Sequence, residues 1–144
     1  MTESADLEKA RELICNSYHS IVVIKDGNIL TKKQGEGIQP FLQVIDELGP
    51  EMENSTIGDR TLGKASALLC AYAKIKEVYA PQITKTGLAV LLQAGIPGQT
   101  DKIIPYITNQ AGNDRCPYEK LLERINDPKE AYTLLQQKIS KIKN

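Results

Sequence analysis

The order of strand and helix patterns between residues 77 and 107 constrains the fold of this chain more than any other feature. A short apolar run over residues 77–80 predicts a strand. A helical pattern follows, with Thr84 placed to cap its start and Gly95 to end it, and a second strand is expected over residues 102–107. Two strands joined in this way pair in parallel through a right-handed crossover. We therefore expect an α/β fold of three layers, α/β/α, with helices on both faces of a mixed sheet.

The N-terminal half of the chain adds a hairpin to this sheet. The β-branched run over residues 21–24 predicts a buried strand, Asp26-Gly27 predicts a tight turn, and residues 29–31 begin the return strand. The polar stretch over residues 49–56 is expected to be the longest loop. Apolar residues at helical spacing predict further helices over residues 5–17, from Pro40, from about Leu62, from Cys116 and from Pro128.

Length and composition limit the kinds of partner that we expect. A chain of 144 residues predicts a single domain over residues 1–144, with an additional C-terminal helix over about residues 128–142. Eighteen basic residues balance eighteen acidic ones, which argues against a nucleic-acid-binding protein. No apolar run suits a signal peptide or a membrane span, and the three cysteines are widely spaced. We therefore expect a cytoplasmic protein with no nucleic-acid partner and no membrane partner.

The sequence lacks the residues of a conventional zinc site. Such sites take three or four ligands from cysteine, histidine and carboxylates, often as closely spaced pairs. There is one histidine, His19, which we interpret as a boundary residue between a helix and a strand, and there is no Cys-x-x-Cys pair. We therefore expect no metal and no other cofactor.

Residues 58–65 match most of a phosphate-binding loop, because they contain the pattern Gly-x-x-x-x-Gly-Lys. Ala65 stands where such a loop needs a Ser or Thr hydroxyl for magnesium, so we exclude a nucleotide triphosphatase. Asp59 is expected to cap the following helix. Gly63 weakens the first turn of that helix, which a closely approaching ligand or backbone segment would explain. Lys64 either holds an anionic group of a ligand or is a solvated side chain, and both interpretations stay open.

A second unusual helix start, Cys-Pro-x-Glu, lies at residues 116–119. Cys116 takes the N-cap position, and Glu119 is placed to accept a hydrogen bond from the backbone N–H of Cys116. Arg115 favours a thiolate at Cys116, whereas Glu119 and Asp114 oppose it. Cys116 is therefore either a nucleophile or part of a rigid helix start.

A glycine-bearing loop follows the hairpin. Gly35 and Gly37 either present backbone N–H groups to an anion or form an ordinary turn. The third glycine of a dinucleotide-binding fingerprint is missing, so we do not expect that motif.

Several motifs in a fixed order resemble a known family. They are Ser20-Ile21-Val22-Val23 with Lys25-Asp26-Gly27, Gly35-x-Gly37-Ile38-x-Pro40, Asp59-x-x-x-Gly63-Lys64-Ala65-x-Ala67, Val78-Tyr79-Ala80, Pro105-Tyr106-Ile107-x-Asn109 and Cys116-Pro117-x-Glu119. The family that they resemble is the uncharacterised domain of unknown function 1893. The resemblance runs from about residue 7 to about residue 125. Family patterns often carry Lys at the position of Arg60 and Arg at the position of Gln110.

The resemblance implies a cytidine-deaminase-like fold. Zinc deaminases of that fold use a His-x-Glu segment and a later Pro-Cys-x-x-Cys segment. Here the corresponding residues are 58–60, which lack histidine, and 81–84, which lack a cysteine pair, so the usual zinc chemistry has no ligands. The recurring polar positions that the resemblance implies are Asp59, Lys64, Asn109, Cys116 and Glu119.

We hypothesise a metal-free, deaminase-like domain that binds a nucleotide or ribosyl-type small molecule at the C-terminal ends of the parallel strands. The alternative is a non-catalytic binding or scaffold protein whose motif residues are helix caps, and the sequence leaves open whether any reaction is catalysed. Deaminase-like folds often assemble, so the resemblance also allows a homo-oligomer. The candidate catalytic residues are Asp59, Lys64, Cys116 and Glu119, and the candidate ligand-binding residues are Gly35, Gly37, Gly63 and Asn109.

Overall fold

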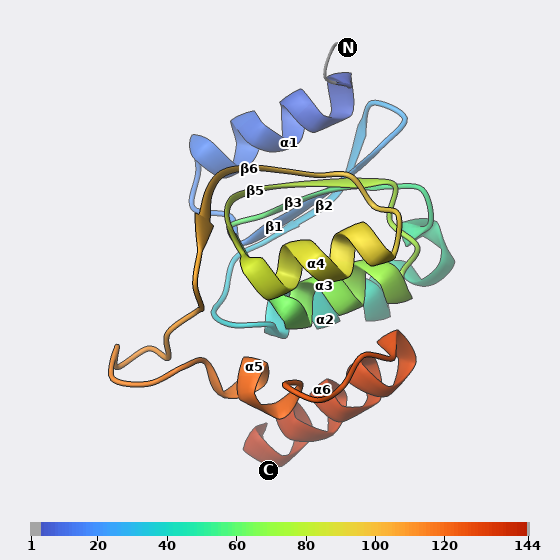
Figure 1. Cartoon of the computed structure of the whole chain (residues 1–144). Helices are drawn as coiled ribbons and strands as arrows, with labels where there is room; N and C mark the ends of the chain where they lie inside the picture. The colour runs from blue at the N-terminus through green and yellow to red at the C-terminus, as the bar shows by residue number, and fades with distance from the viewer. Residues whose placement is uncertain (1–3, 144) are drawn as a thin grey trace.

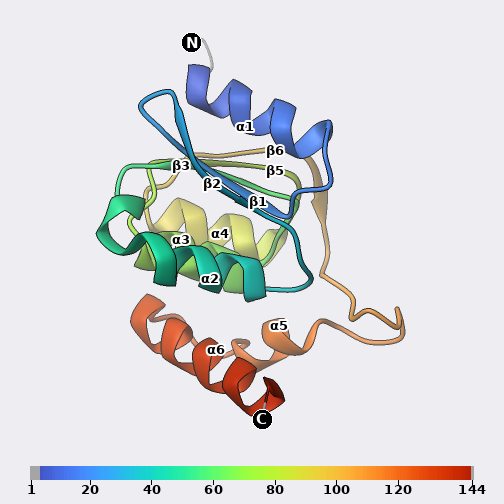
Figure 2. The same ribbon diagram turned by 180° about the vertical axis from the view of Figure 1, so that it is seen from behind.

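The computed structural model describes residues 4–143 and has a mixed sheet of six strands at its centre. Helix α1 covers one face of the sheet, and α2, α3 and α4 cover the other (Figure 1). Helices α5 and α6 form a further layer outside α2–α4, as the reverse view also shows (Figure 2). The expected α/β fold is confirmed. The helices are α1 (Ala5–Cys15), α2 (Gln39–Leu48), α3 (Lys64–Tyr72), α4 (Lys85–Gln93), α5 (Pro117–Leu121) and α6 (Pro128–Lys143).

The sheet combines an antiparallel half with a parallel half. Strands β1 and β2 form the expected hairpin, and β1 also pairs antiparallel with β3. Strand β5 pairs in parallel with β3, β4 and β6, as the strand–helix–strand order predicts. Strands β3 and β4 pair with successive parts of β5, and Arg60 lies between them in the sequence. The strands are β1 (Ile21–Lys25), β2 (Asn28–Lys33), β3 (Thr56–Asp59), β4 (Thr61–Leu62), β5 (Glu77–Thr84) and β6 (Gly98–Ile104).

Local sequence signals set several element ends as predicted. Asp26 and Gly27 have φ values of 51° and 82°, and positive φ at both central residues is the turn that matches strand twist. The Thr84 hydroxyl accepts a hydrogen bond of 2.9 Å from the Gly87 N–H and caps α4. Gly95, with a φ of 73°, follows the end of that helix.

The apolar core lies on both faces of the sheet, because successive side chains of a strand point to opposite faces. In β1, Ile21 and Val23 pack in the layer of α2–α4, whereas Val22 and Ile24 pack against α1. All four side chains are buried, and each buried side chain of this size stabilises the fold by about 1.5–3 kcal/mol.

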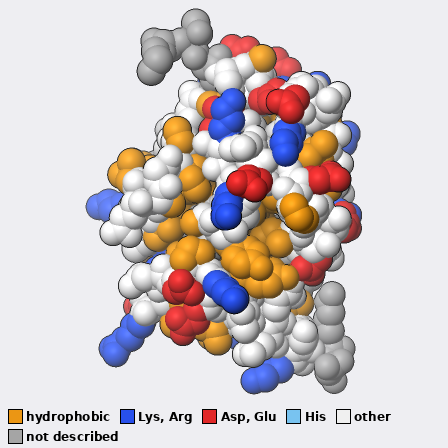
Figure 3. All heavy atoms as spheres, turned by 90° about the vertical axis from the view of Figure 1, so that its right-hand side faces the viewer, with side chains coloured by type: hydrophobic (Ala, Val, Ile, Leu, Met, Phe, Trp, Pro, Cys, Tyr) orange, Lys and Arg blue, Asp and Glu red, His pale blue; other side chains and the backbone are white. Residues whose placement is uncertain are grey.

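The outer layer attaches to the main body through the apolar face of α6. Ala131, Leu135 and Ile139 are buried against the core on the α3 side. The rings of Tyr72 and Tyr132 stack with their centroids 4.4 Å apart. Figure 3 shows the side of the molecule away from the loop that follows β6, where hydrophobic side chains gather across the middle of the surface among charged groups.

Several predicted boundaries were wrong. Residues 49–56 are not one loop, because a 3-10 turn (Gly49–Met52) and the first residue of β3 lie there. Strand β5 runs on to Thr84, so residues 81–84 lie within it, and β6 spans 98–104 rather than 102–107. Helix α3 begins at Lys64 rather than near Leu62. Strand β3 was missed because its sequence, Thr-Ile-Gly-Asp, has only a weak strand signal, and its pairing with β1 and β5 decides its structure.

Across residues 4–143, the helices are all too short or too polar to cross a membrane.

Candidate functional site

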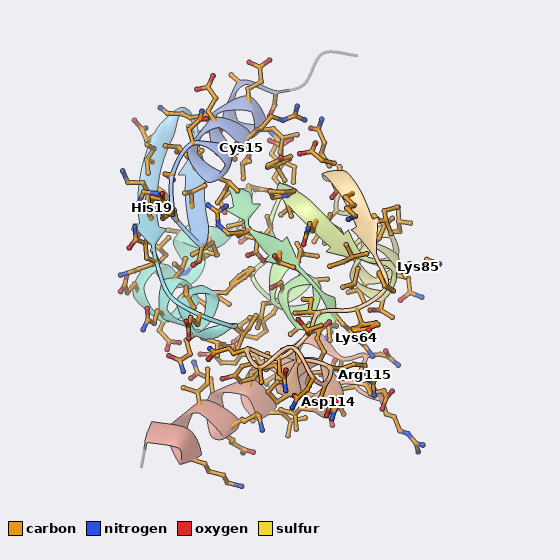
Figure 4. The ribbon with its side chains drawn as sticks, turned by 90° about the vertical axis from the view of Figure 1, so that its left-hand side faces the viewer. Cys15, His19, Lys64, Lys85, Asp114 and Arg115 are labelled. Carbon is orange, nitrogen blue, oxygen red and sulfur yellow. The ribbon has the colours of Figure 1, made fainter. Side chains whose placement is uncertain are left out.

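A cavity of about 480 Å³ lies beside the end of β3. Its walls come from three parts of the chain: the Gly35–Gly37 loop, the β3–α3 segment, and the stretch from Ile107 to the start of α5. Figure 4 views this end of the molecule, where Lys64, Asp114 and Arg115 lie together at the boundary between the main body and the outer layer. The cavity therefore joins segments that are far apart in the sequence.

Asp59 is the last residue of β3 and lines the cavity. The residue is only 9% exposed. Its Oδ2 atom is buried and has no hydrogen-bond partner among residues 4–143. Burial raises the pKa of Asp59 to about 7, against the opposing effects of the Ser66 hydroxyl and the Arg60 backbone N–H. The expected role of Asp59 as the cap of α3 was wrong, because the N-cap residue is Gly63.

Glu119 is the residue that caps α3, although it belongs to α5. Its Oε1 accepts a hydrogen bond from the Lys64 N–H and its Oε2 one from the Ala65 N–H, both of 2.8 Å. The capping box expected within α5 was wrong, because the Cys116 N–H donates to the Ile107 carbonyl at 2.7 Å instead. A negative group at a helix N-terminus also interacts favourably with the helix dipole.

Gly63 is explained by this contact. A Cβ atom on residue 63 would lie 2.7 Å from Cδ of Glu119 and 2.7 Å from Cδ1 of Ile107, closer than real Cβ contacts allow. The close approach expected from the sequence is present, but the approaching group is a side chain rather than a ligand or a backbone segment.

The basic residues of this region are committed to protein contacts. Lys64 does not line the cavity, and its Nζ donates to the Glu123 carbonyl at 3.0 Å. Arg60 does line the cavity, but its guanidinium donates to three backbone carbonyls at 2.6–3.0 Å. These carbonyls belong to the end of α1 and the segment leading to β1, namely those of Ile14, Ser17 and His19. Arg60 thus fixes the end of α1 to the site.

The Gly35–Gly37 loop forms the opposite wall. Gly35 exchanges hydrogen bonds with Ser20, whose hydroxyl donates to the Gly35 carbonyl at 2.6 Å and accepts from the Gly35 N–H at 3.1 Å. Gly37, with a φ of 64°, lies so close to the Tyr118 ring that a Cβ would come within 3.0 Å of it. The Gln110 side chain donates to the Glu36 carboxylate, which links the two loops across the cavity.

Two further candidate residues lie in the third wall, the stretch from Ile107 to the start of α5. Asn109 lines the cavity, but its side chain makes hydrogen bonds with Asn113 and stabilises the turn of the loop. Cys116 is the N-cap of α5, lines the cavity and is partly exposed. Of the eight candidate residues, the cavity lining therefore includes all except Lys64.

Ser66 and Tyr118 are among the lining residues that sequence reasoning missed. Ser66 is a buried polar residue within an otherwise apolar stretch of α3, and that contrast was the available signal. Tyr118 stands inside the motif at residues 116–119, but an aromatic residue there also suits a core position.

Within residues 4–143, no group of three or more histidine, cysteine and acidic residues is arranged to hold a metal ion. His19 lies outside the cavity lining, with Nδ1 2.6 Å from the Ser17 hydroxyl.

The model of one protein family matches residues 9–139, which is most of the chain. The chain belongs to the family described as domain of unknown function (DUF1893). The match includes most of α6, so the resemblance reaches farther than the expected limit near residue 125. None of the curated proteins matches the chain.

Several solved structures are similar to this chain to different degrees. A DUF1893 family protein from Thermotoga maritima is 24% identical, with a TM-score of 0.86 over 96% of this chain and 92% of that one. RibD of Acinetobacter baumannii is 18% identical, with a TM-score of 0.47 over 66% of this chain and 33% of RibD. The dCMP deaminase of the cyanophage S-TIM5 is 19% identical, with a TM-score of 0.46 over 67% of this chain and 94% of the deaminase.

Proposed function

We propose that this DUF1893 protein binds a small molecule of the nucleotide or ribosyl type in the cavity, with Asp59 as its principal hydrogen-bonding partner. The observation that carries this proposal is the buried Oδ2 atom of Asp59, which has no partner among residues 4–143. Leaving such an atom unsatisfied costs about 1–3 kcal/mol or more, and a ligand hydroxyl or amine would remove that cost.

The position and size of the cavity support this class of ligand. Asp59 ends β3, and ligands of open α/β sheets bind beyond the carboxyl ends of strands, where an acidic side chain often binds ribose hydroxyls. The volume of about 480 Å³ lies within the range of small-molecule sites. The walls also carry the hydroxyl-bearing side chains of Ser66 and Tyr118.

The same cavity offers the groups for metal-free chemistry. Asp59, with its pKa raised by burial to about 7, suits a proton acceptor near neutral pH. Cys116 lines the cavity and supplies a thiol that a neighbouring base can activate. Glu119 and Lys64 have structural roles in this proposal. The Glu119 carboxylate binds the α3 backbone, and the Lys64 ammonium group binds the Glu123 carbonyl.

A ligand panel tests the proposal. Purified protein is titrated calorimetrically with ribose, adenosine, cytidine and their monophosphates, with Asp59→Asn as the test variant. Asp26→Asn is a matched control, because Asp26 lies at the exposed hairpin tip and asparagine tolerates its positive φ. We expect binding by the wild type and the control, and weaker binding by Asp59→Asn. Absence of binding across the whole panel would contradict the proposal.

The alternative function, a non-catalytic scaffold, is favoured by one observation: the Glu119 carboxylate caps α3, and Cys116 takes the N-cap position of α5, where its side chain makes no capping hydrogen bond. Substitution Cys116→Ala separates the two functions. If it lowers the free energy of unfolding by about 1 kcal/mol and leaves every ligand response unchanged, the capping role suffices. Light scattering on the same preparation measures whether a homo-oligomer forms.

A further inference from the structure

The titratable side chains that line the cavity are mainly acidic. Three acidic side chains line it, those of Glu36, Asp59 and Glu119. Among residues 4–143, Arg60 is the one basic residue in the lining, and its guanidinium donates to backbone carbonyls of the α1–β1 segment. A phosphate group placed in this cavity would therefore meet three acidic side chains and one guanidinium whose Nε and Nη2 atoms already donate to the backbone. Juxtaposed like charges disfavour binding strongly.

The backbone N–H groups at the start of α3 are the other place where a phosphate would bind in many proteins. Here the N–H groups of Lys64 and Ala65 donate to the Glu119 carboxylate at 2.8 Å. The Lys64 ammonium group donates away from the cavity, to the Glu123 carbonyl. Glu119 therefore occupies the position that an anionic ligand would take.

The carboxyl group of Asp59 indicates which ligand groups the cavity can bind. Its carboxyl is buried in the lining, with Oδ2 lacking a partner, so it can accept hydrogen bonds from a hydroxyl or an amine. A deprotonated phosphate has only acceptor oxygens, so it cannot donate to Asp59 once that carboxyl is ionised, which its pKa of about 7 places above neutral pH.

Given the proposed function, we infer that the cavity selects the unphosphorylated member of the ligand class, a ribosyl compound or nucleoside, and that Glu119 excludes the phosphorylated form. Glu119 is thus a specificity-determining residue that acts by filling the N-terminus of α3.

Competing ligands test this selectivity. Calorimetry compares adenosine with adenosine monophosphate, and cytidine with cytidine monophosphate, on the wild type, Glu119→Ala, Glu119→Gln and the control Glu123→Ala. Glu123 is a suitable control, because its carboxylate is exposed and pairs with Arg115. We expect the wild type and the control to prefer the nucleoside by about tenfold or more. We expect Glu119→Ala to reduce or reverse this preference, and Glu119→Gln to change it less.

A wild type that binds the monophosphate as tightly as the nucleoside would overturn the selectivity and leave the proposed function intact. If no nucleoside or sugar binds at all, the proposed function fails.

Inorganic phosphate then tests Glu119 independently of any organic ligand. We expect phosphate to raise the melting temperature of Glu119→Ala more than that of the wild type or Glu123→Ala. Equal shifts in all three proteins would overturn the exclusion by Glu119. If Glu119→Ala does not fold, Glu119→Ser takes its place in the same comparison, because its short side chain also leaves the N-terminus of α3 open.

Discussion

The carboxyl group of Glu119 fills the space that a side chain at Gly63 would need. A Cβ at Gly63 would lie 2.7 Å from Cδ of Glu119, and the same carboxylate accepts hydrogen bonds from the next two N–H groups of the chain. The two residues are 56 positions apart in the sequence, so this helix cap exists only in the folded protein. It holds α5, one wall of the cavity, against the start of α3.

Substitution Gly63→Ala should destabilise the protein. The added methyl group must displace Glu119 or Ile107, and overpacking of this kind costs about 1–3 kcal/mol. Urea unfolding measures the loss. The cost should shrink in a Glu119→Ala background, since one of the two clashing side chains is then gone. An equal cost in both backgrounds would show that Gly63 is needed for another reason.

Substitution Glu119→Ala should itself lower the free energy of unfolding by about 0.5–2 kcal/mol, the usual value of a helix cap. The reason is that two backbone N–H groups of α3 lose their acceptor. Glu123→Ala, which removes an exposed carboxylate from the same region, should cost about 0–1 kcal/mol. If the two variants unfold alike in urea, the Glu119 contacts do not stabilise α3.

The stability of the protein should depend on pH through Asp59. Its carboxyl has a pKa of about 7 in the folded protein, whereas an aspartate exposed to water ordinarily has a pKa of 3.8. Between these values the folded protein keeps a proton that the unfolded chain releases. The contribution of Asp59 to the free energy of unfolding should therefore be highest below about pH 4 and fall as pH rises towards 7, by up to about 4 kcal/mol.

Asp59→Asn isolates that contribution, because asparagine does not titrate. Urea unfolding between pH 4 and pH 8 should show a shallower decline in this variant than in the wild type, whereas Asp26→Asn should follow the wild type. A variant with the same decline as the wild type would mean that Asp59 is not a neutral acid in the folded protein near pH 6.

The three cysteines should differ in reactivity with iodoacetamide, as mass spectrometry of tryptic peptides can measure. Cys15 is exposed and Cys116 partly exposed, whereas Cys70 is buried, and its thiol has a raised pKa because of that burial. We expect Cys70 to react only after unfolding. Adenosine or cytidine, if bound in the cavity, should slow the reaction of Cys116 and leave that of Cys15 unchanged. Equal protection of both thiols would argue against binding beside Cys116.

Those parts of the fold that rest on neighbouring residues could be predicted from the sequence. The cap at Thr84 and the turn at Asp26 each depend on groups within about three residues. Strand β3 could not be predicted, because four residues including a glycine and an aspartate become a strand only between β1 and β5. The end of β6 was misplaced for a related reason, since pairing with β5 decides where the strand stops.

In the candidate site too, local sequence predicted some features and only the folded structure determined the others. Asp59, Gly63, Cys116 and Glu119 stood out as polar or unusual residues at two helix starts, and the folded chain brings all of them to one cavity. Their partners could not be inferred, because the hydrogen bonds of Glu119 span 54 and 55 residues. Nothing in the local pattern showed that Lys64 would face away from the cavity.

The sequence by itself determined the α/β class, the hairpin, the helix caps formed by local groups, and the set of unusual polar residues. It could do so because propensity, turn geometry and capping depend on residues close together in the chain. The tertiary structure alone decided that Asp59 would be buried with its Oδ2 atom unpartnered and that Glu119 would cap α3 from another helix. Burial and long-range hydrogen bonds depend on which segments meet in space, and these two contacts are what give the cavity its acidic character.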